Sequence, residues 1–165
     1  MSAPLVLCNI SSSCLAGVPL EEAWEQLRDF GNADWASGVD LSGEFIPVTS
    51  YMLEAVPGST VGAHRHVDVG HGAMVERLVS LNDYEHSMAW SVVSHPNNTN
   101  PFPGSYLNSL VHLSLKPVSM GNATFIKLSS SFSTEASHKE LMETTFRRLY
   151  DSAVINVQRW VCRPH

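Results

Sequence analysis

The pattern of hydrophobic and polar positions changes its period twice along the chain. Residues 4–14 form a short apolar segment with strand character. A helix is predicted over 19–30, where two glutamates in the first turn and one apolar stripe are typical of a helix start. Residues 32–36 predict one further helical turn. The chain therefore begins with a strand followed by two short helices.

Between residue 43 and residue 133 the helical period is lost. The chain instead shows apolar segments of roughly eight to ten residues separated by turn residues, which is typical of an antiparallel meander. The longest loop, 95–105, is rich in Asn, Pro and Gly and is predicted to be irregular. The predicted strands are 43–49, 51–56, 60–69, 73–81, 87–95, 105–115 and 123–133.

The last segment returns to the helical period. Ser137 and Glu140 match a capping box. A helix of about 24 residues, roughly 36 Å long, is predicted after it. The stripe consists of Met142, Phe146, Leu149, Ala153, Val157 and Trp160. Only a sheet offers a partner surface of that length, so the chain is expected to form one α+β domain over 1–165.

A predicted hairpin places two opposite charges on one apolar face. Gly and His at 70–71 suit a two-residue type II′ turn, and that turn sets Arg65 opposite Glu76. An unpaired charge on a buried face would be very costly, whereas a facing pair is tolerated. The pair is either a structural ion pair that fixes the register or one in which Glu76 also presents an oxygen to a ligand.

The opposite face of the same strand carries His64 and His66. This His-x-His is similar to the first metal-binding motif of cupins, and two such histidines can share a metal ion. Cupins supply a glutamate four or five residues after the second histidine, where this chain has Gly70 and His71. We therefore expect no metal site, and histidines that face solvent.

Several short motifs occur in a fixed order after the first strand. They are Val61-Gly62-x-x-Arg65, Glu76-Arg77-Leu78, Asn82-Asp83-x-Glu85, Trp90-Ser91, Ser105-Tyr106 and Ile155-Asn156-Val157-Gln158-Arg159. In this order the chain resembles the START-like (SRPBCC) superfamily, which includes polyketide cyclase/dehydrase-type proteins, the birch-pollen-allergen group and the plant abscisic acid receptors. The resemblance implies a helix-grip fold. A seven-stranded antiparallel sheet would wrap around a long C-terminal helix, with two short helices after the first strand and a cavity inside.

The resemblance also implies which residues line that cavity. It carries over the positions of Arg65, Glu76, Trp90, Tyr106, Asn108 and Asn156. Period two adds Leu110 and His112 to the face of Tyr106, while the other inner positions add Phe132, Phe146, Leu149 and Ala153. We assign possible catalytic roles to Glu76, Tyr106 and His112, and ligand contact to the rest. Trp90, Tyr106 and His112 could equally be plain core residues.

Three features depart from the abscisic acid receptors. Their ligand-anchoring lysine falls near Pro47, their Ser-Gly-Leu-Pro gate is replaced by the turn at 70–71, and their His-Arg-Leu latch by loop 95–105. Hormone perception through those loops is therefore not expected.

The composition and net charge of the chain limit the classes of molecule that it is expected to bind. The net charge of −6 and the absence of a basic cluster argue against nucleic acid or an anionic membrane. No apolar run reaches the roughly 18 residues of a transmembrane span, and the N-terminus lacks a basic n-region. The three cysteines show no metal-site spacing and are expected to be free thiols in a reducing cytosol. We expect a cytoplasmic monomer or homodimer without cofactor, whose partner is a small hydrophobic molecule.

Two functions suit such a domain. The first is a cyclase or dehydratase, a lyase- or isomerase-type enzyme that acts on a carbonyl-containing hydrophobic substrate in the cavity. The second is a non-catalytic carrier or sensor of a lipid, pigment or hormone-like molecule. The fold does not separate the two, because function depends on the residues of the site.

Overall fold

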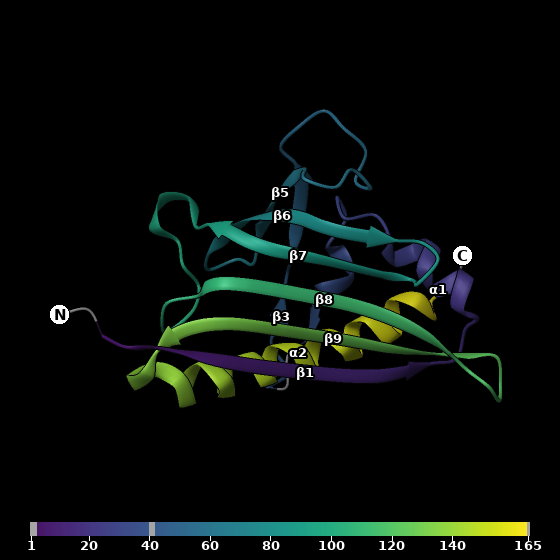
Figure 1. Ribbon diagram of the computed structural model, residues 1–165. Coiled ribbons are helices and arrows are strands. Elements are labelled where there is room, and N and C mark those ends of the chain that lie inside the picture. The colour runs from purple at the N-terminus through teal and green to yellow at the C-terminus, as the bar shows by residue number, and fades with distance from the viewer. Residues whose placement is uncertain (1–2, 40–41, 165) are drawn as a thin grey trace.

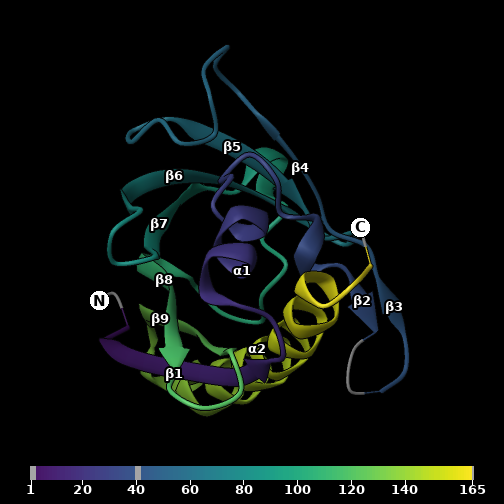
Figure 2. The ribbon, with the colours of Figure 1, turned by 90° about the vertical axis from the view of Figure 1, so that its right-hand side faces the viewer.

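The computed structural model describes residues 3–39 and 42–164, and in it one curved antiparallel sheet wraps around one long helix (Figures 1 and 2). The sheet has seven strands in the order β1-β9-β8-β7-β6-β5-β4. The strands are β1 (Leu5–Ala16), β4 (Thr49–Met52), β5 (His64–Asp68), β6 (Ala73–Asn82), β7 (Ser87–Ser94), β8 (Leu107–Val118) and β9 (Ala123–Glu135). The predicted helix-grip architecture is confirmed.

Two short helices follow β1, as predicted. α1 (Leu20–Leu27) buries Trp24, and η1 (Asp34–Ala36) is a single 3-10 turn. The Asp83 carboxylate, in the turn after β6, accepts hydrogen bonds from Trp24 Nε1 at 2.8 Å and Arg28 Nε at 2.9 Å. These contacts hold α1 at one end of the sheet.

The strands expected between residues 43 and 69 are shorter than predicted. Segment 43–49 is interrupted by Pro47 and becomes β3 (Phe45–Ile46) and the start of β4. Proline cannot donate a ladder hydrogen bond, which explains the break. Segment 51–56 leaves the sheet after Met52, and segment 60–69 joins it only at His64, after Gly62 with φ +91°.

A separate two-stranded ribbon forms from this region. β2 (Gly38–Val39) pairs with β3, and Figure 2 shows the ribbon beside α2, away from the main sheet. Isolated two-stranded ribbons are marginally stable in water, so the ribbon depends on packing against its neighbours. It contacts α2 directly.

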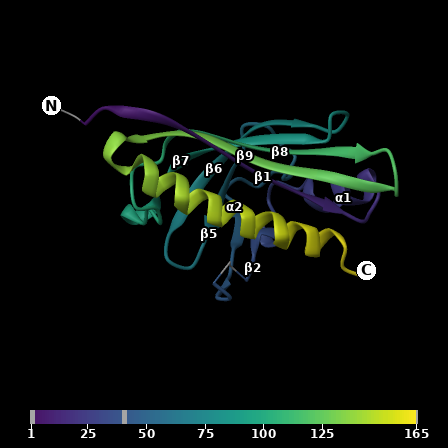
Figure 3. The same cartoon turned by 90° about the horizontal axis from the view of Figure 1, so that it is seen from below.

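The long C-terminal helix α2 (Lys139–Val161) has 23 residues and crosses the concave side of the sheet (Figure 3). The expected capping box is wrong. Ser137 lies in the 3-10 turn η3 (Ala136–His138), so the residue before α2 is His138, whose side chain makes no capping hydrogen bond. Of the predicted stripe, Met142, Phe146 and Val157 are buried, whereas Leu149 and Ala153 are half-buried because they border a cavity.

The β5–β6 hairpin has the predicted register. Gly70 adopts φ +86°, the Val69 N–H donates to the Gly72 carbonyl at 2.9 Å, and Arg65 lies opposite Glu76. Both charged side chains are buried, with exposed fractions of 2% and 5%. A two-residue turn thus sets the register of the pair.

His64 and His66 lie on the outer face of this hairpin. His64 Nδ1 contacts Glu54 Oε1 at 2.6 Å, and the His66 ring stacks on Tyr51. Over residues 3–39 and 42–164 no three His, Cys, Asp or Glu side chains come together as metal ligands would.

We expect elemental analysis of the untagged protein to find no stoichiometric zinc, iron or copper. The physical reason is that a structural zinc ion requires four protein ligands and a catalytic one three, whereas the His64–His66 pair supplies two. One equivalent of metal that is lost when both histidines are replaced by alanine would contradict this prediction.

A β-bulge in β8 reverses the predicted face of three site residues. Between Leu107 and Leu110 the β8–β9 register shifts, and Asn108 adopts φ +50°. An extra residue at a bulge exchanges the two faces of the strand beyond it. Asn108, Leu110 and His112 are therefore exposed on the outer face, and the prediction that they share the face of Tyr106 is wrong.

Two further expectations concern the whole chain. The three cysteines are free thiols, as predicted. Among the described helices, none is long and apolar enough to cross a membrane.

Candidate functional site

A cavity of about 240 Å³ lies between the sheet, α2, η1 and the β2–β3 ribbon. This volume is slightly below the roughly 300–1,000 Å³ of typical small-molecule sites. Most of the lining is apolar: it includes Trp35, Ile46, Val67, Met74, Val92, Phe102, Val111, Leu128 and Leu149. A mostly apolar enclosure with a few polar groups is the usual composition of a binding site for a small molecule.

The structure brings eight of the predicted site residues to this cavity. They are Arg65, Glu76, Trp90, Tyr106, Phe146, Leu149, Ala153 and Asn156. Phe132 lies one layer behind the lining, with its ring centroid 4.9 Å from that of Tyr106 and 4.6 Å from that of Phe146. It supports the wall of the cavity.

The remaining predicted residues lie on the other side of the sheet. Leu110 and His112 border a second depression, on the outer face of the sheet, together with Asn9, Ser11, Ser129 and Ser131. Partial burial, and then the charges of Lys127 and Lys116, lower the pKa of His112 below its usual value. Because the sheet separates His112 from the cavity, it cannot act on a molecule bound there.

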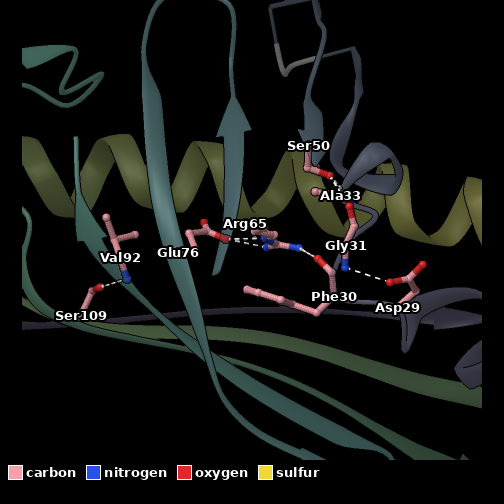
Figure 4. Close-up of polar contacts among 9 residues, drawn as sticks. All are labelled: Asp29, Phe30, Gly31, Ala33, Ser50, Arg65, Glu76, Val92 and Ser109. Atoms are coloured by element: carbon pink, nitrogen blue, oxygen red, sulfur yellow. Dashed lines mark hydrogen bonds and ion pairs between the residues drawn. The ribbon is translucent and has the colours of Figure 1, made fainter. Parts of the chain in front are cut away.

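The polar floor of the cavity is the Arg65–Glu76 ion pair (Figure 4). Arg65 Nε and Nη2 reach Glu76 Oε2 at 2.7 and 2.6 Å, and Nη1 donates to the Phe30 carbonyl at 2.7 Å. The guanidinium also packs on the rings of Phe30 and Trp90, 4.1 and 5.1 Å from their centroids. Every nitrogen of this buried cation has a hydrogen-bond partner, which holds the side chain in place. The negative charge of Glu76 balances the positive charge of Arg65, so the pair as a whole is neutral.

A cluster of buried hydroxyl groups lies close to the ion pair. Tyr106 Oη and Ser130 Oγ are 3.0 Å apart, and Tyr106 also interacts with Ser109 and Tyr150. Burial raises the pKa of Tyr106 to about 12, and burial also raises the pKa of Tyr150 well above its usual value. The charge of Glu76 acts in the same direction on both pKa values. Both phenols therefore remain protonated at neutral pH.

The bulge in β8 explains how Ser109 enters this cluster. It turns Ser109 inward, three residues after Tyr106, where an uninterrupted strand would place it outward. Ser109 Oγ accepts the Val92 N–H at 2.8 Å, as Figure 4 shows. The side chain thereby satisfies a backbone donor of β7 beyond the last β7–β8 pair, Trp90 with Val111.

Asn156 lines the cavity where α2 meets the β2–β3 ribbon. A Cβ atom at Gly38 would lie only 2.1 Å from Asn156 Oδ1, so the ribbon backbone passes directly over the amide. In the same region, Trp35 Nε1 and Ser152 Oγ are buried and lack a hydrogen-bond partner among the described residues.

Sequence reasoning missed several lining residues, among them Trp35, Phe102, Tyr150 and Ser152. The position of Tyr150 could have been predicted from the sequence, since it follows Phe146 by four residues and therefore lies on the same helix face. Trp35 and Phe102 come from a 3-10 turn and an irregular loop, where no period indicates direction.

Comparisons with known proteins agree with this architecture. Residues 8–160 match the sequence profile of the family described as polyketide cyclase / dehydrase and lipid transport. No curated protein matches the chain. Among solved structures, similar ones include a Bacillus thuringiensis protein of uncharacterised function, with 20% identity, TM-score 0.71, and coverage of 94% of this chain and 100% of that one.

Two further structures share the fold. A protein of Nitrosospira multiformis is 20% identical with TM-score 0.67, covering 91% of this chain and 96% of its own. Ara h 8.0201 is 10% identical with TM-score 0.65, and the alignment covers 94% and 98% of the two chains.

Proposed function

Because this chain belongs to the polyketide cyclase/dehydrase and lipid transport family, we propose that its cavity binds one small, largely apolar molecule and carries or senses it without chemical change. The START-like resemblance found in the sequence is confirmed, and a domain for hydrophobic ligands is common to both functions considered above. Of the carrier or sensor and the cyclase or dehydratase, we propose the carrier or sensor.

The observation that carries this choice is the position of His112 outside the cavity. It leaves Glu76 and Tyr106 as the candidate catalytic groups inside. Glu76 is held by two bonds to Arg65, and Tyr106 keeps its proton because its pKa is about 12. A general acid or base works best with a pKa near the operating pH, which Tyr106 does not have.

Native mass spectrometry of the untagged protein tests the proposal. A carrier or sensor retains its ligand, so we expect a discrete mass increase that disappears after organic extraction and returns when the extract is added back. An enzyme releases its product. Extract components that are consumed and reappear as new compounds in solution would contradict a carrier role.

One observation favours a cyclase or dehydratase as the second candidate. The Tyr106 phenol is a buried, protonated donor close to a carboxylate, an arrangement that could bind a substrate carbonyl and assist its enolisation. The same experiment separates the two, since Tyr106→Phe would then abolish conversion of the extract components while leaving ligand retention intact.

A further inference from the structure

The charged groups of the cavity indicate which kind of polar ligand it accepts. The lining contains two basic side chains, Arg65 and His71, and one carboxylate, Glu76. Arg65 is 2% exposed, and each of its nitrogens already has an oxygen partner. His71 belongs to the exposed turn at the end of the hairpin. The described part of the lining therefore offers no unpaired cation in its interior.

The ion pair leaves one hydrogen-bond acceptor available to a ligand, the second carboxylate oxygen of Glu76. Both bonds from Arg65 go to Glu76 Oε2. Oε1 accepts no hydrogen bond from the described residues, although Glu76 lines the cavity. A carboxylate oxygen has room for more than one donor, and Oε1 is not among the fully buried side-chain atoms without a partner, so it is open to a donor from the cavity. A ligand that donates to Oε1 forms a charge-assisted hydrogen bond there.

We infer that the ligand is an uncharged molecule that carries a hydroxyl group, an alcohol or a phenol, and that this hydroxyl donates to Glu76 Oε1. The inference rests on the proposed binding function and specifies its ligand class. The apolar remainder of the molecule would occupy the space bordered by Val67, Met74, Leu128 and Leu149.

Other ligand charges fit the cavity less well. A carboxylic acid would bring its anion toward Glu76 with no free cation to compensate, and an unpaired buried charge is very costly. An amine would bring a cation to a pair that is already neutral. An ether or ester of the same shape would fill the apolar space but leave Oε1 without a donor. A hydroxyl donates to Oε1 without adding charge, and it keeps acceptor capacity for a donor of the lining such as Trp35 Nε1.

A second polar point agrees with a neutral ligand. The Asn156 amide, which lines the cavity, offers one acceptor and two donors and carries no charge. It can contact a further hydroxyl or carbonyl on the ligand. Neither polar point supplies the positive charge that recognition of an acid requires.

A matched series of naphthalenes tests the inference on the unmodified protein. Naphthol, methoxynaphthalene and naphthoate, substituted at the same ring position, are titrated by calorimetry at neutral pH. Because a hydrogen bond to a charged group is among the stronger ones, naphthol should bind about ten-fold or more tightly than methoxynaphthalene. Naphthoate should bind weakest of the three.

The outcomes separate this inference from the proposed function. Naphthoate binding as tightly as naphthol, or methoxynaphthalene matching it, would overturn the hydroxyl assignment while leaving a binding cavity. If all three compounds and an apolar dye fail to bind, the proposed function itself fails.

Glu76→Gln supplies an independent check. It keeps the shape of the side chain but removes the negative charge beside Arg65, so the preference should reverse and naphthoate should bind more tightly than naphthol. The matched control is Glu85→Gln, which changes an exposed carboxylate in the turn between β6 and β7 that pairs with Lys116 of β8; it should leave the order unchanged. If Glu76→Gln does not fold, the ligand series on the unmodified protein still decides the question.

Discussion

Glu76→Ala is expected to lower the free energy of unfolding by roughly 3–5 kcal/mol, because it leaves the Arg65 guanidinium buried without its counter-charge. The exposed fraction of Arg65 is 2%, so solvent compensates little for the lost carboxylate. For a domain of this size the expected fall in Tm is about 6–20 °C. Differential scanning calorimetry at neutral pH measures it.

Two controls separate the buried charge from loss of packing. Glu85→Ala removes an exposed carboxylate whose pair with Lys116 spans 3.5 Å, and it should change Tm by little, since such pairs contribute about 0–1 kcal/mol. The double variant Arg65→Met/Glu76→Leu removes both charges and should recover much of the loss. A Glu76→Ala protein as stable as the parent would mean that the pair is not buried in solution.

The second large effect concerns ligand binding. Ala153 lies on α2 and lines the cavity with its methyl group. Ala153→Trp would place an indole in a space of about 240 Å³. Saturable binding of an environment-sensitive apolar dye should therefore fall about ten-fold or more, as expected when the volume that a ligand needs is occupied. Fluorescence titration measures this change.

The control for Ala153→Trp is Ile155→Trp, which adds the same indole to a more exposed part of α2. It should leave dye affinity unchanged, and both variants should keep helix content by circular dichroism. Dye binding that survives Ala153→Trp would place the dye site outside this cavity.

Local patterns were sufficient wherever a feature depends on residues close in the chain. The turn at 70–71 sets the pairing of Arg65 with Glu76, because a two-residue turn leaves one register in which the apolar face is buried. The period of residues 139–161 likewise identifies α2 and most of its buried face. Both features follow from geometry within one hairpin or one helix.

Local sequence patterns could not predict which side chains of β8 point into the cavity and which point outward. Alternation predicts direction only while a strand is uninterrupted, and one inserted residue at Asn108 reverses every later position. Asn is among the residues that tolerate positive φ, but many asparagines do not adopt it. The bulge becomes visible only with β9 alongside, and it is what moves His112 out of the candidate site.

The sequence by itself determined the domain type, the order of its elements and the buried ion pair, since each depends on short-range period, turn chemistry or the cost of an unpaired charge. The tertiary structure alone decided which side chains surround an open space. The cavity lies where α2, η1, the β2–β3 ribbon and the sheet meet, and the distances between these elements depend on contacts far apart in the chain, such as Gly38 against Asn156. No local pattern records whether such surfaces pack solidly or leave a space, because that depends on how side chains from all of them fit together.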